Sequence, residues 1–418
     1  MTGSRRDFLR GATAAAAALP PVASWLAANA STPIRDESFW RKIRQAFIFD
    51  ERKVPMNAAN LCPSPRSVFE RVMSLTRDID ADCSFQNREK FAKYRDESRA
   101  SVAGYLGAST DEIALVRNTS EANNVIVQGV ALKPGDEVVV WDQNHPTNHV
   151  AWSVRAARIG FSVKRVRTPT APASEDELID VFVKALGPKT RVLALTHVSN
   201  VSGIQLPIKE ICRQAHKRDI FVHVDGAQTC GALRVDLHDL DCDSYSASAH
   251  KWLVGPKEVG ILYIRESRID KVWPLIVGSG WGEKVQPASR GARKFETLGQ
   301  RNDAALAALA MAIEFHNRIG PDLIETRIYE LVAALKASCK ELGLDLVTPF
   351  APQLSAGVCT IQAPPARRRQ LFERMYNEFG IAAAPTGGLR FCPHLYNTME
   401  HIERVVRGLK AMRKLFEG

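Results

Sequence analysis

The stretch HVDGAQTCGALRVDLHDLDCDSYSASAHKWLVGP, residues 223–256, contains the residues that decide the predicted fold. In it an apolar run ends on Asp225, and a second strand-like run is followed by Lys251 shortly before a Gly-Pro turn. In a doubly wound α/β sheet, residues at the carboxyl ends of parallel strands face the ligand crevice. We therefore expect Asp225 and Lys251 to belong to one site.

The chemistry of these two side chains indicates what lies between them. A buried carboxylate needs a cationic partner. A lysine with apolar neighbours is costly unless its amine is neutral or covalently engaged, and both conditions suit a lysine that forms a Schiff base. A ring that offers a protonated pyridine nitrogen to Asp225 and an aldehyde to Lys251 satisfies both residues. The alternative is an ordinary surface lysine and an aspartate that caps a helix.

The rest of the chain fits an α/β architecture. Its 418 residues, of which 45% are hydrophobic, predict one large domain and a smaller one. Short β-branched runs alternate with helix-period segments, which is typical of βαβ units and a largely parallel sheet. The strand-like runs are 137–141, 191–196 and 220–225, and one helical segment is 207–217.

Residues 1–30, MTGSRRDFLRGATAAAAALPPVASWLAANA, have the organisation of an export signal. A basic start precedes an apolar stretch, and the segment closes on an A-x-A cleavage site. The run SRRDFLR resembles the twin-arginine signal, which directs the export of folded proteins. We expect a periplasmic or secreted protein, exported by the twin-arginine machinery with its cofactor loaded and without a stable membrane anchor after cleavage. The alternatives are a chance basic cap on a Sec signal and a membrane anchor.

Charge and cysteine content argue against several kinds of site. The formal net charge of +10 is diffuse, and the run 367–369 of three arginines lies in a helix-like segment, so no nucleic-acid partner is expected. The eight cysteines are scattered, with no C-x-x-C pair and no metal-ligand spacing. We expect no metal site and mostly buried thiols, because a protein folded in the reducing cytoplasm would not need disulfides.

The block HVDGAQ followed by SASAHKW resembles the pyridoxal-phosphate enzymes of the class V aminotransferase family, which includes cysteine desulfurases and isopenicillin N epimerase-like proteins. The resemblance implies a fold-type I α/β transferase with pyridoxal 5'-phosphate as its cofactor. Its large domain would contain a mostly parallel sheet of the seven-stranded type, and its C-terminal domain would be small and α+β. We expect a signal peptide, an N-terminal segment packing on the small domain, a large cofactor-binding domain and the small domain, at residues 1–30, 31–63, 64–310 and 311–418.

The resemblance also implies roles for residues around the cofactor ring. Asp225 would hold the pyridine nitrogen protonated, Lys251 would form the Schiff base, and Gln228 would bond the phenolic oxygen. Ser248 and His250 would bind the phosphate. Asp225 and Lys251 are thus expected to act as catalytic residues.

Three further segments match the same family. Thr119 and Ser120, between a short strand and a helix start, would bind the phosphate, although plain helix capping predicts the same residues. His145 would stack on the ring as a catalytic residue, although Asn144 stands where an acidic residue is common. Asn200 would lie near the phenolic oxygen, and its alternative is an ordinary turn residue.

The substrate and the partner subunit are also implied. Arg390, in GGLRFCPHLYNT, would clamp the α-carboxylate of the substrate, because a planar guanidinium donates two parallel hydrogen bonds to a carboxylate. A surface arginine on a strand is the alternative. The loop 296–301 corresponds to a family segment that contacts the phosphate bound by a second subunit, which implies a homodimer. Gln300 departs from the family pattern, in which threonine is usual.

Several reactions of an amino-acid-type substrate fit this set of residues. Lys251 is the natural base for removing the α-proton, and transamination follows if the same lysine returns the proton to the cofactor. Epimerisation, as in isopenicillin N epimerase-like proteins, needs a proton donor on the opposite face, near His145. A C–S lyase, or an enzyme that modifies a secreted peptide or siderophore, is a further alternative.

Two other functions are disfavoured by the sequence. Cysteine desulfurases carry a nucleophilic cysteine shortly before the carboxylate-binding arginine, but residues 380–389 contain none and Cys392 follows Arg390. A degenerate binding protein without activity is the non-enzyme alternative. Such a scaffold has no physical use for so costly a set of polar residues.

Overall fold

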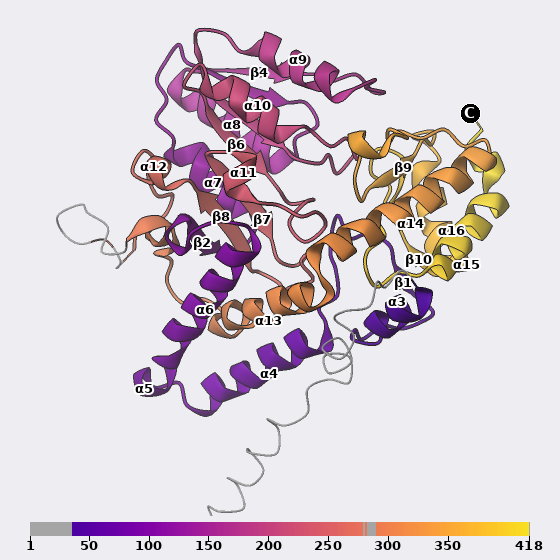
Figure 1. The fold of residues 1–418 in the computed structure, drawn as a ribbon, viewed down its shortest axis with the longest axis horizontal. Helices are drawn as coiled ribbons and strands as arrows, with labels where there is room; N and C mark the ends of the chain where they lie inside the picture. The colour runs from indigo at the N-terminus through magenta and orange to yellow at the C-terminus, as the bar shows by residue number, and fades with distance from the viewer. Residues whose placement is uncertain (1–35, 279–280, 282–289, 418) are drawn as a thin grey trace, which may run out of the picture.

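The computed structural model describes residues 36–278, 281 and 290–417, and its centre is a seven-stranded sheet with helices on both faces (Figure 1). The strands are β2 (Ile113–Val116), β3 (Glu137–Trp141), β4 (Ser162–Val166), β5 (Thr190–Thr196), β6 (Phe221–Asp225), β7 (Ser244–Ser248) and β8 (Gly260–Ile264). Their order is β2-β8-β7-β6-β5-β3-β4, and β8 runs in the direction opposite to the other six strands of this sheet. This sheet confirms the predicted α/β class, and the predicted signal peptide lies outside the described residues.

The strands alternate their side chains between two cores. Val138 and Val140 pack with α7 (Thr119–Gly129) and α8 (Pro146–Ile159). Val139 packs in the opposite core, to which the short α11 (Leu237–Leu240) and four longer helices contribute. The longer helices are α6 (Lys90–Tyr105), α9 (Glu175–Ala185), α10 (Ile208–His216) and α13 (Asp303–Ile319). Because successive strand residues point to opposite faces, an entirely apolar strand is buried on both.

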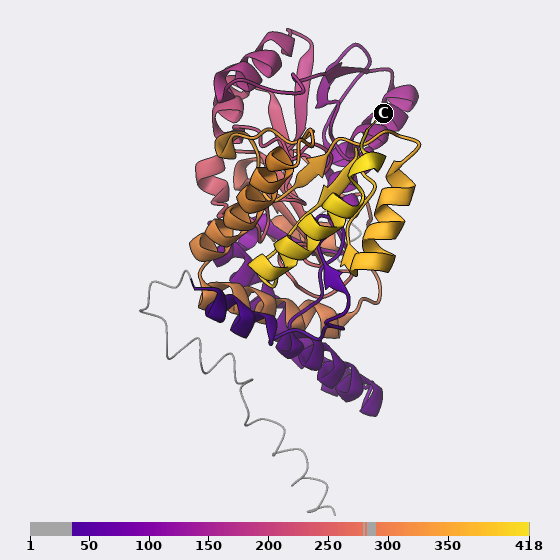
Figure 2. The ribbon, with the colours of Figure 1, turned by 90° about the vertical axis from the view of Figure 1, so that its right-hand side faces the viewer.

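The two ends of the described chain pack together (Figure 2). In one small sheet β1 (Val54–Pro55) pairs in parallel with β10 (Ile381–Ala382), and in another β9 (Cys359–Ile361) pairs with β11 (Leu389–Phe391). The helices of this part are α3 (Glu37–Arg44), α14 (Pro321–Glu341), α15 (Arg368–Phe379) and α16 (Met399–Ala411). Helix α13 spans the expected boundary at residue 310, and the division into domains stays a prediction.

A helical hairpin extends beside the central sheet. Helix α4 (Arg66–Ala81) leads to α5 (Phe85–Arg88), and α6 returns to the body, with α5 at the tip of the hairpin in Figure 1. Both long helices pack on α13. The remaining short helices are α12 (Glu266–Ile269) and 3-10 turns at Thr110–Glu112, Gly291–Glu296, Pro352–Leu354 and Arg413–Leu415. In the described part of the chain, no helix has the length and apolar character required to cross a membrane.

Candidate active site

A cavity of about 190 Å³ lies at the carboxyl ends of the parallel strands. Thr196, Asp225 and Ser248 are the last residues of β5, β6 and β7, and all three line the cavity. Every residue that the sequence predicted to contact the cofactor lines it as well: Thr119, Ser120, His145, Asn200, Asp225, Gln228, Ser248, His250 and Lys251. The roles of these residues toward a cofactor stay predictions, but the fold brings all of them to one place.

Asp225 lines the cavity and is oriented by two hydrogen bonds. Asp225 is 2% exposed and is the last residue of β6, whose backbone pairs with both neighbouring strands. The Ala227 backbone N–H donates to Oδ1 at 3.0 Å, and the Asn123 side-chain amide donates to Oδ2 at 3.0 Å. One neutral donor on each oxygen fixes the plane of the carboxylate while leaving its negative charge without a cationic hydrogen-bond partner among the described residues.

Lys251 lies just beyond the end of β7 and is partly buried in the same cavity. Burial lowers the pKa of its amine, the charge of Asp225 opposes this shift, and the charge of Arg390 adds to it. A lysine must be neutral to attack an aldehyde, so the lowered pKa increases the reactive fraction of the amine. The position in the cavity and the lowered pKa are both expected of a lysine that binds an aldehyde covalently.

The start of α7 lies at the cavity and offers groups that suit an anion. Asn118 caps this helix by accepting from the Glu121 N–H at 3.0 Å, and it lines the cavity together with Thr119 and Ser120. The Thr119 N–H donates to the Ser248 hydroxyl at 2.8 Å, and the two hydroxyl oxygens are 2.6 Å apart. Hydroxyls and free amides at a helix N-terminus suit a phosphate. Close contact with β8 depends on Gly260, since a Cβ there would lie 2.6 Å from Asn118 Cα.

His145 is the N-cap of α8, a role that the sequence analysis did not assign. Its Nδ1 accepts from the Thr147 N–H at 3.3 Å and lies 2.9 Å from the Thr147 hydroxyl. Desolvation lowers the pKa of the imidazole, the charges of Lys251 and Arg390 add to this effect, and Asp225 opposes it. A neutral ring held by a helix cap is suited to stacking on a flat cofactor.

The remaining predicted contacts are anchored by the outer part of the chain. Gln228 donates to the Ala59 carbonyl at 3.1 Å and accepts from the Trp252 indole at 2.8 Å, so one amide hydrogen remains for a ligand. His250 is half-buried, and burial lowers its pKa to about 4. A neutral imidazole at this position retains one N–H as a donor to a phosphate.

Arg390 is not among the residues that line the cavity, although it lies close enough to influence His145 and Lys251 electrostatically. It is 4% exposed, its guanidinium donates to the Asn200 carbonyl and to Asn57 Oδ1, and its Nε has no partner in the described structure. Two of its donors are thus already used by the protein. Its predicted role as the carboxylate clamp stays a prediction.

The structure also shows residues that the sequence analysis missed. Thr196 lines the cavity with a buried hydroxyl oxygen that has no hydrogen-bond partner in the described structure. Asn123, one turn after Thr119 on α7, is fully buried and reaches Asp225. Helical spacing of four residues from Thr119 was the only available signal, since the partner strand is far away in the sequence.

These observations fit pyridoxal phosphate. A helix N-terminus, a carboxylate without a cationic hydrogen-bond partner, a partly buried lysine and an unsatisfied hydroxyl converge on one cavity. No group of three or more potential metal ligands occurs within the described residues. The eight cysteines are free thiols, and Cys392 is fully buried with its pKa raised by burial, which does not suit a nucleophile.

Comparison with known proteins identifies similar chains over nearly the same length. The model of the family described as aminotransferase class-V matches residues 61–407. The chain is 32% identical to an isopenicillin N epimerase of Streptomyces clavuligerus, covering 89% of this chain and 98% of that protein. It is 29% identical to a probable cysteine desulfurase of Xylella fastidiosa strain 9a5c, covering 90% and 96% respectively.

Solved structures show the same fold. The apo structure of a cysteine desulfurase from Thermococcus onnurineus NA1 superimposes with a TM-score of 0.80 at 23% identity, covering 90% of this chain and 98% of that one. A complex of the cystine C-S lyase C-DES with cysteine persulfide gives a TM-score of 0.79 at 23% identity, covering 86% and 97%. Together with the family match, these similarities confirm the predicted fold-type I architecture.

Proposed function

Because the chain belongs to the class-V aminotransferase family, whose members use pyridoxal phosphate, we propose that it is an enzyme that removes the α-proton of an amino-acid-type substrate, with transamination as the outcome. The observation that carries this proposal is the partly buried Lys251, with its lowered pKa, in one cavity with Asp225. When bound, pyridoxal phosphate supplies an electron sink that makes the α-proton acidic.

Different residues of the cavity would bind the cofactor and transfer the proton. The helix end at Thr119, with Ser248, would hold the phosphate, Asp225 the ring nitrogen, and His145 the face of the ring. Lys251 would hold the aldehyde carbon and, once displaced by the substrate, would accept the α-proton on Nζ. A single base then suffices for transamination, because the same amine can return the proton to the cofactor.

Epimerisation is the second candidate, and the similarity to isopenicillin N epimerase over 98% of that protein favours it. It requires a proton donor on the face opposite Lys251. His145 lines the cavity and is the candidate for this proton donor. The stacking proposed for His145 would, however, already engage its imidazole ring with the face of the cofactor. The two candidates therefore differ in what His145 does.

One experiment separates these reactions. The purified protein is loaded with pyridoxal phosphate and mixed with a panel of amino donors in deuterated water, while absorbance and mass are followed. Transamination converts the cofactor to its amine form and bleaches its visible band, whereas epimerisation introduces deuterium at Cα without bleaching. A protein that stays colourless with pyridoxal phosphate would contradict both.

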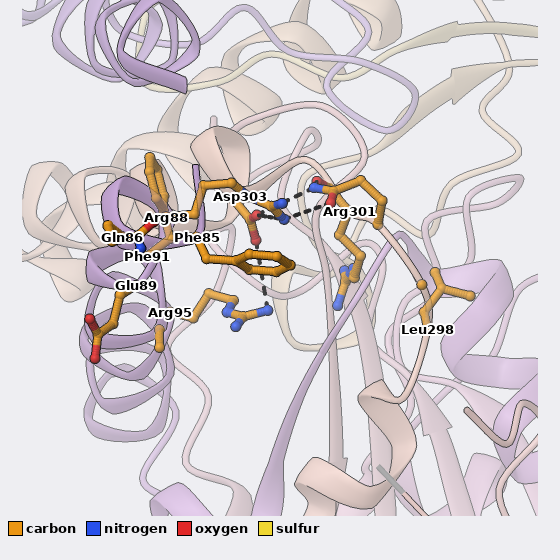
Figure 3. A pocket seen from close by; sticks show the side chains of 12 residues that line it. Phe85, Gln86, Arg88, Glu89, Phe91, Arg95, Leu298, Arg301 and Asp303 are labelled. Atoms are coloured by element: carbon orange, nitrogen blue, oxygen red, sulfur yellow. Dashed lines mark hydrogen bonds and ion pairs between the residues drawn. The ribbon is translucent and has the colours of Figure 1, made fainter. Parts of the chain in front are cut away.

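We also propose that the protein is a homodimer. The hairpin of α4, α5 and α6 exposes Phe69, Met73 and Phe85, and the Phe85 side chain is 87% exposed. Beside Phe85 is a cavity of about 750 Å³, into which Arg95 and Arg301 point (Figure 3). This cavity is lined by most of the loop 296–301, which the sequence predicted to contact a second subunit.

We expect Phe85→Glu to shift the sedimentation coefficient toward that of the monomer. Phe350→Glu, at an exposed aromatic residue on another surface, should not. A monomeric wild type would refute the proposal.

Export in the folded state is the remaining proposal. It is supported by the sequence of residues 1–30, in particular by Arg5 and Arg6 in SRRDFLR. A cofactor that must be loaded before translocation gives a physical reason for such a route.

A further inference from the structure

We propose that Asn123 is a positioning residue that holds Asp225 in the orientation needed to pair with the ring nitrogen of the cofactor, an inference that rests on the proposed function. Asn123 does not line the cavity, so it would act through Asp225 alone. Its side chain is fully buried on α7, and Nδ2 donates to Asp225 Oδ2 at 3.0 Å. No other side chain donates to Asp225 within the described residues.

The orientation of the Asn123 amide is fixed by the Asp225 carboxylate, which can only accept, and is supported by two donors at the other end of the amide. Oδ1 lies 2.5 Å from the Ser246 hydroxyl and 2.9 Å from His223 Nε2. A carbonyl oxygen can only accept, so His223 must carry its proton on Nε2. A flipped amide would place its oxygen against the Asp225 carboxylate with no proton between the two acceptors, so the amide has one stable orientation.

His223 is in turn held as a neutral donor. It is fully buried, and burial lowers its pKa to about 3, so the ring carries no charge at neutral pH. With the proton on Nε2, its Nδ1 is an acceptor for the Ser244 hydroxyl at 2.8 Å. Every polar atom in this chain of contacts therefore has a partner of the correct type, which is the condition for a rigid buried network.

The network joins the three elements that carry the cofactor contacts. Asn123 belongs to the helix whose first turn lies at the cavity, His223 to β6, and Ser246 to β7, where it pairs in register with Asp225. Loss of the Asn123 amide would leave Asp225 with one backbone donor and free its side chain to rotate. Pairing with the ring nitrogen would weaken, although no group that touches the cofactor had changed.

The test measures binding of two cofactors by equilibrium titration of the apoprotein: pyridoxal phosphate and its 1-deaza analogue, which has carbon in place of the ring nitrogen. Asn123→Ala should raise the Kd for pyridoxal phosphate about tenfold or more, because the hydrogen bond to a charged group is lost. It should change the Kd of the analogue by less than about twofold, since the analogue has no ring nitrogen to pair with Asp225. A role in packing alone would weaken both equally.

Two further variants complete the test. Ser246→Ala removes only a hydroxyl that orients the amide, is mild enough to preserve folding, and should raise the Kd for pyridoxal phosphate about threefold with the same selectivity. Asn124→Ala is the matched control, because the Asn124 amide donates to the Ser120 carbonyl and not toward Asp225. It should show no selectivity between the two cofactors.

The outcomes are distinguishable. If Asn123→Ala folds and binds both cofactors as the wild type does, or weakens both alike, the inference is overturned. If Asn123→Ala does not fold, the same comparison is made with Ser246→Ala, and an equal loss or no loss of affinity for the two cofactors overturns the inference. If the wild type itself does not bind pyridoxal phosphate, the proposed function fails before any variant is compared.

Discussion

The hydroxyl oxygens of Thr119 and Ser248 lie 2.6 Å apart, although the two residues are separated by 129 positions in the chain. Thr119 opens α7 and Ser248 ends β7, so the contact joins a helix N-terminus to the carboxyl edge of the sheet. Such a junction is the usual place for a phosphate in an α/β fold. The site therefore depends on a contact between segments that are remote in sequence.

This contact leads to the first prediction. Ser248→Ala should leave the fold intact and raise the Kd for pyridoxal phosphate about tenfold, because a donor to a charged phosphate is lost. Pyridoxal without its phosphate should bind the variant and the wild type alike. Ser101→Ala, which removes an exposed helical hydroxyl, serves as the control. Equal loss of affinity for both vitamers would contradict the phosphate assignment.

The second prediction concerns covalent attachment. Lys251→Ala should abolish turnover and the visible absorbance of the lysine-bound cofactor, and reduction with borohydride should no longer fix the cofactor to the protein. Lys257→Ala is the matched control, because this nearby lysine is exposed and donates to the Ser64 hydroxyl at 3.1 Å. Full activity in the Lys251 variant would refute the assignment.

The third prediction separates substrate binding from cofactor binding. If Arg390 is the carboxylate clamp, Arg390→Ala should raise KM about 10- to 100-fold, because a bidentate partner of the substrate carboxylate would be lost, while the cofactor Kd changes little. Arg390→Lys keeps the positive charge but not the planar guanidinium, so the KM of this variant should lie between those of the wild type and Arg390→Ala. Amines without a carboxylate should not distinguish the variants. A uniform loss with such amines would mean that Arg390 acts through its contacts with Asn200 and Asn57.

The fourth prediction follows from the lowered pKa of Lys251. Only the neutral amine attacks the aldehyde, so the rate of cofactor attachment should rise with pH to a plateau. The midpoint of this rise should lie below the ordinary lysine pKa of 10.5. The charge of Asp225 raises this pKa, so Asp225→Asn should move the midpoint to lower pH. Stopped-flow absorbance against pH measures both midpoints. A shift to higher pH in Asp225→Asn would contradict the electrostatic account.

The fifth prediction concerns export. Replacing Arg5 and Arg6 with lysine should strand the protein in the cytoplasm, because the twin-arginine machinery recognises the arginine pair. Cell fractionation followed by immunoblotting gives the readout, with a change of Lys42 to arginine as the control outside the signal. Continued export of the double variant would indicate the Sec route.

Local patterns predicted much of the fold. Short apolar runs separated by helix-period segments indicated the parallel sheet, and strands 137–141 and 221–225 have the predicted positions to within one residue. The sequence predicted only some of the residues at the N-termini of helices. The role of His145 as the cap of α8 escaped prediction because histidine rarely takes that position, whereas Thr119 and Ser120 occur in an ordinary helix start.

The chemistry of the site was predictable where it depends on adjacent residues. Asp225 at a strand end and Lys251 after a strand could be recognised, since strand ends share one edge of the sheet. Asn123 and Thr196 could not be recognised, because their importance depends on which partner lies across the core. Arg390 was recognised by its sequence block, but its existing hydrogen bonds to Asn200 and Asn57 were not foreseeable.

The sequence by itself determined the class of fold and placed Lys251 and Asp225 at the ends of strands, because hydrophobic periodicity and the cost of burying charge are local properties of the chain. The tertiary structure alone decided which hydroxyl meets which helix end and which amide supports Asp225. These pairings depend on distances and orientations between α7, β6 and β7, and such geometry arises only when the elements pack into one core.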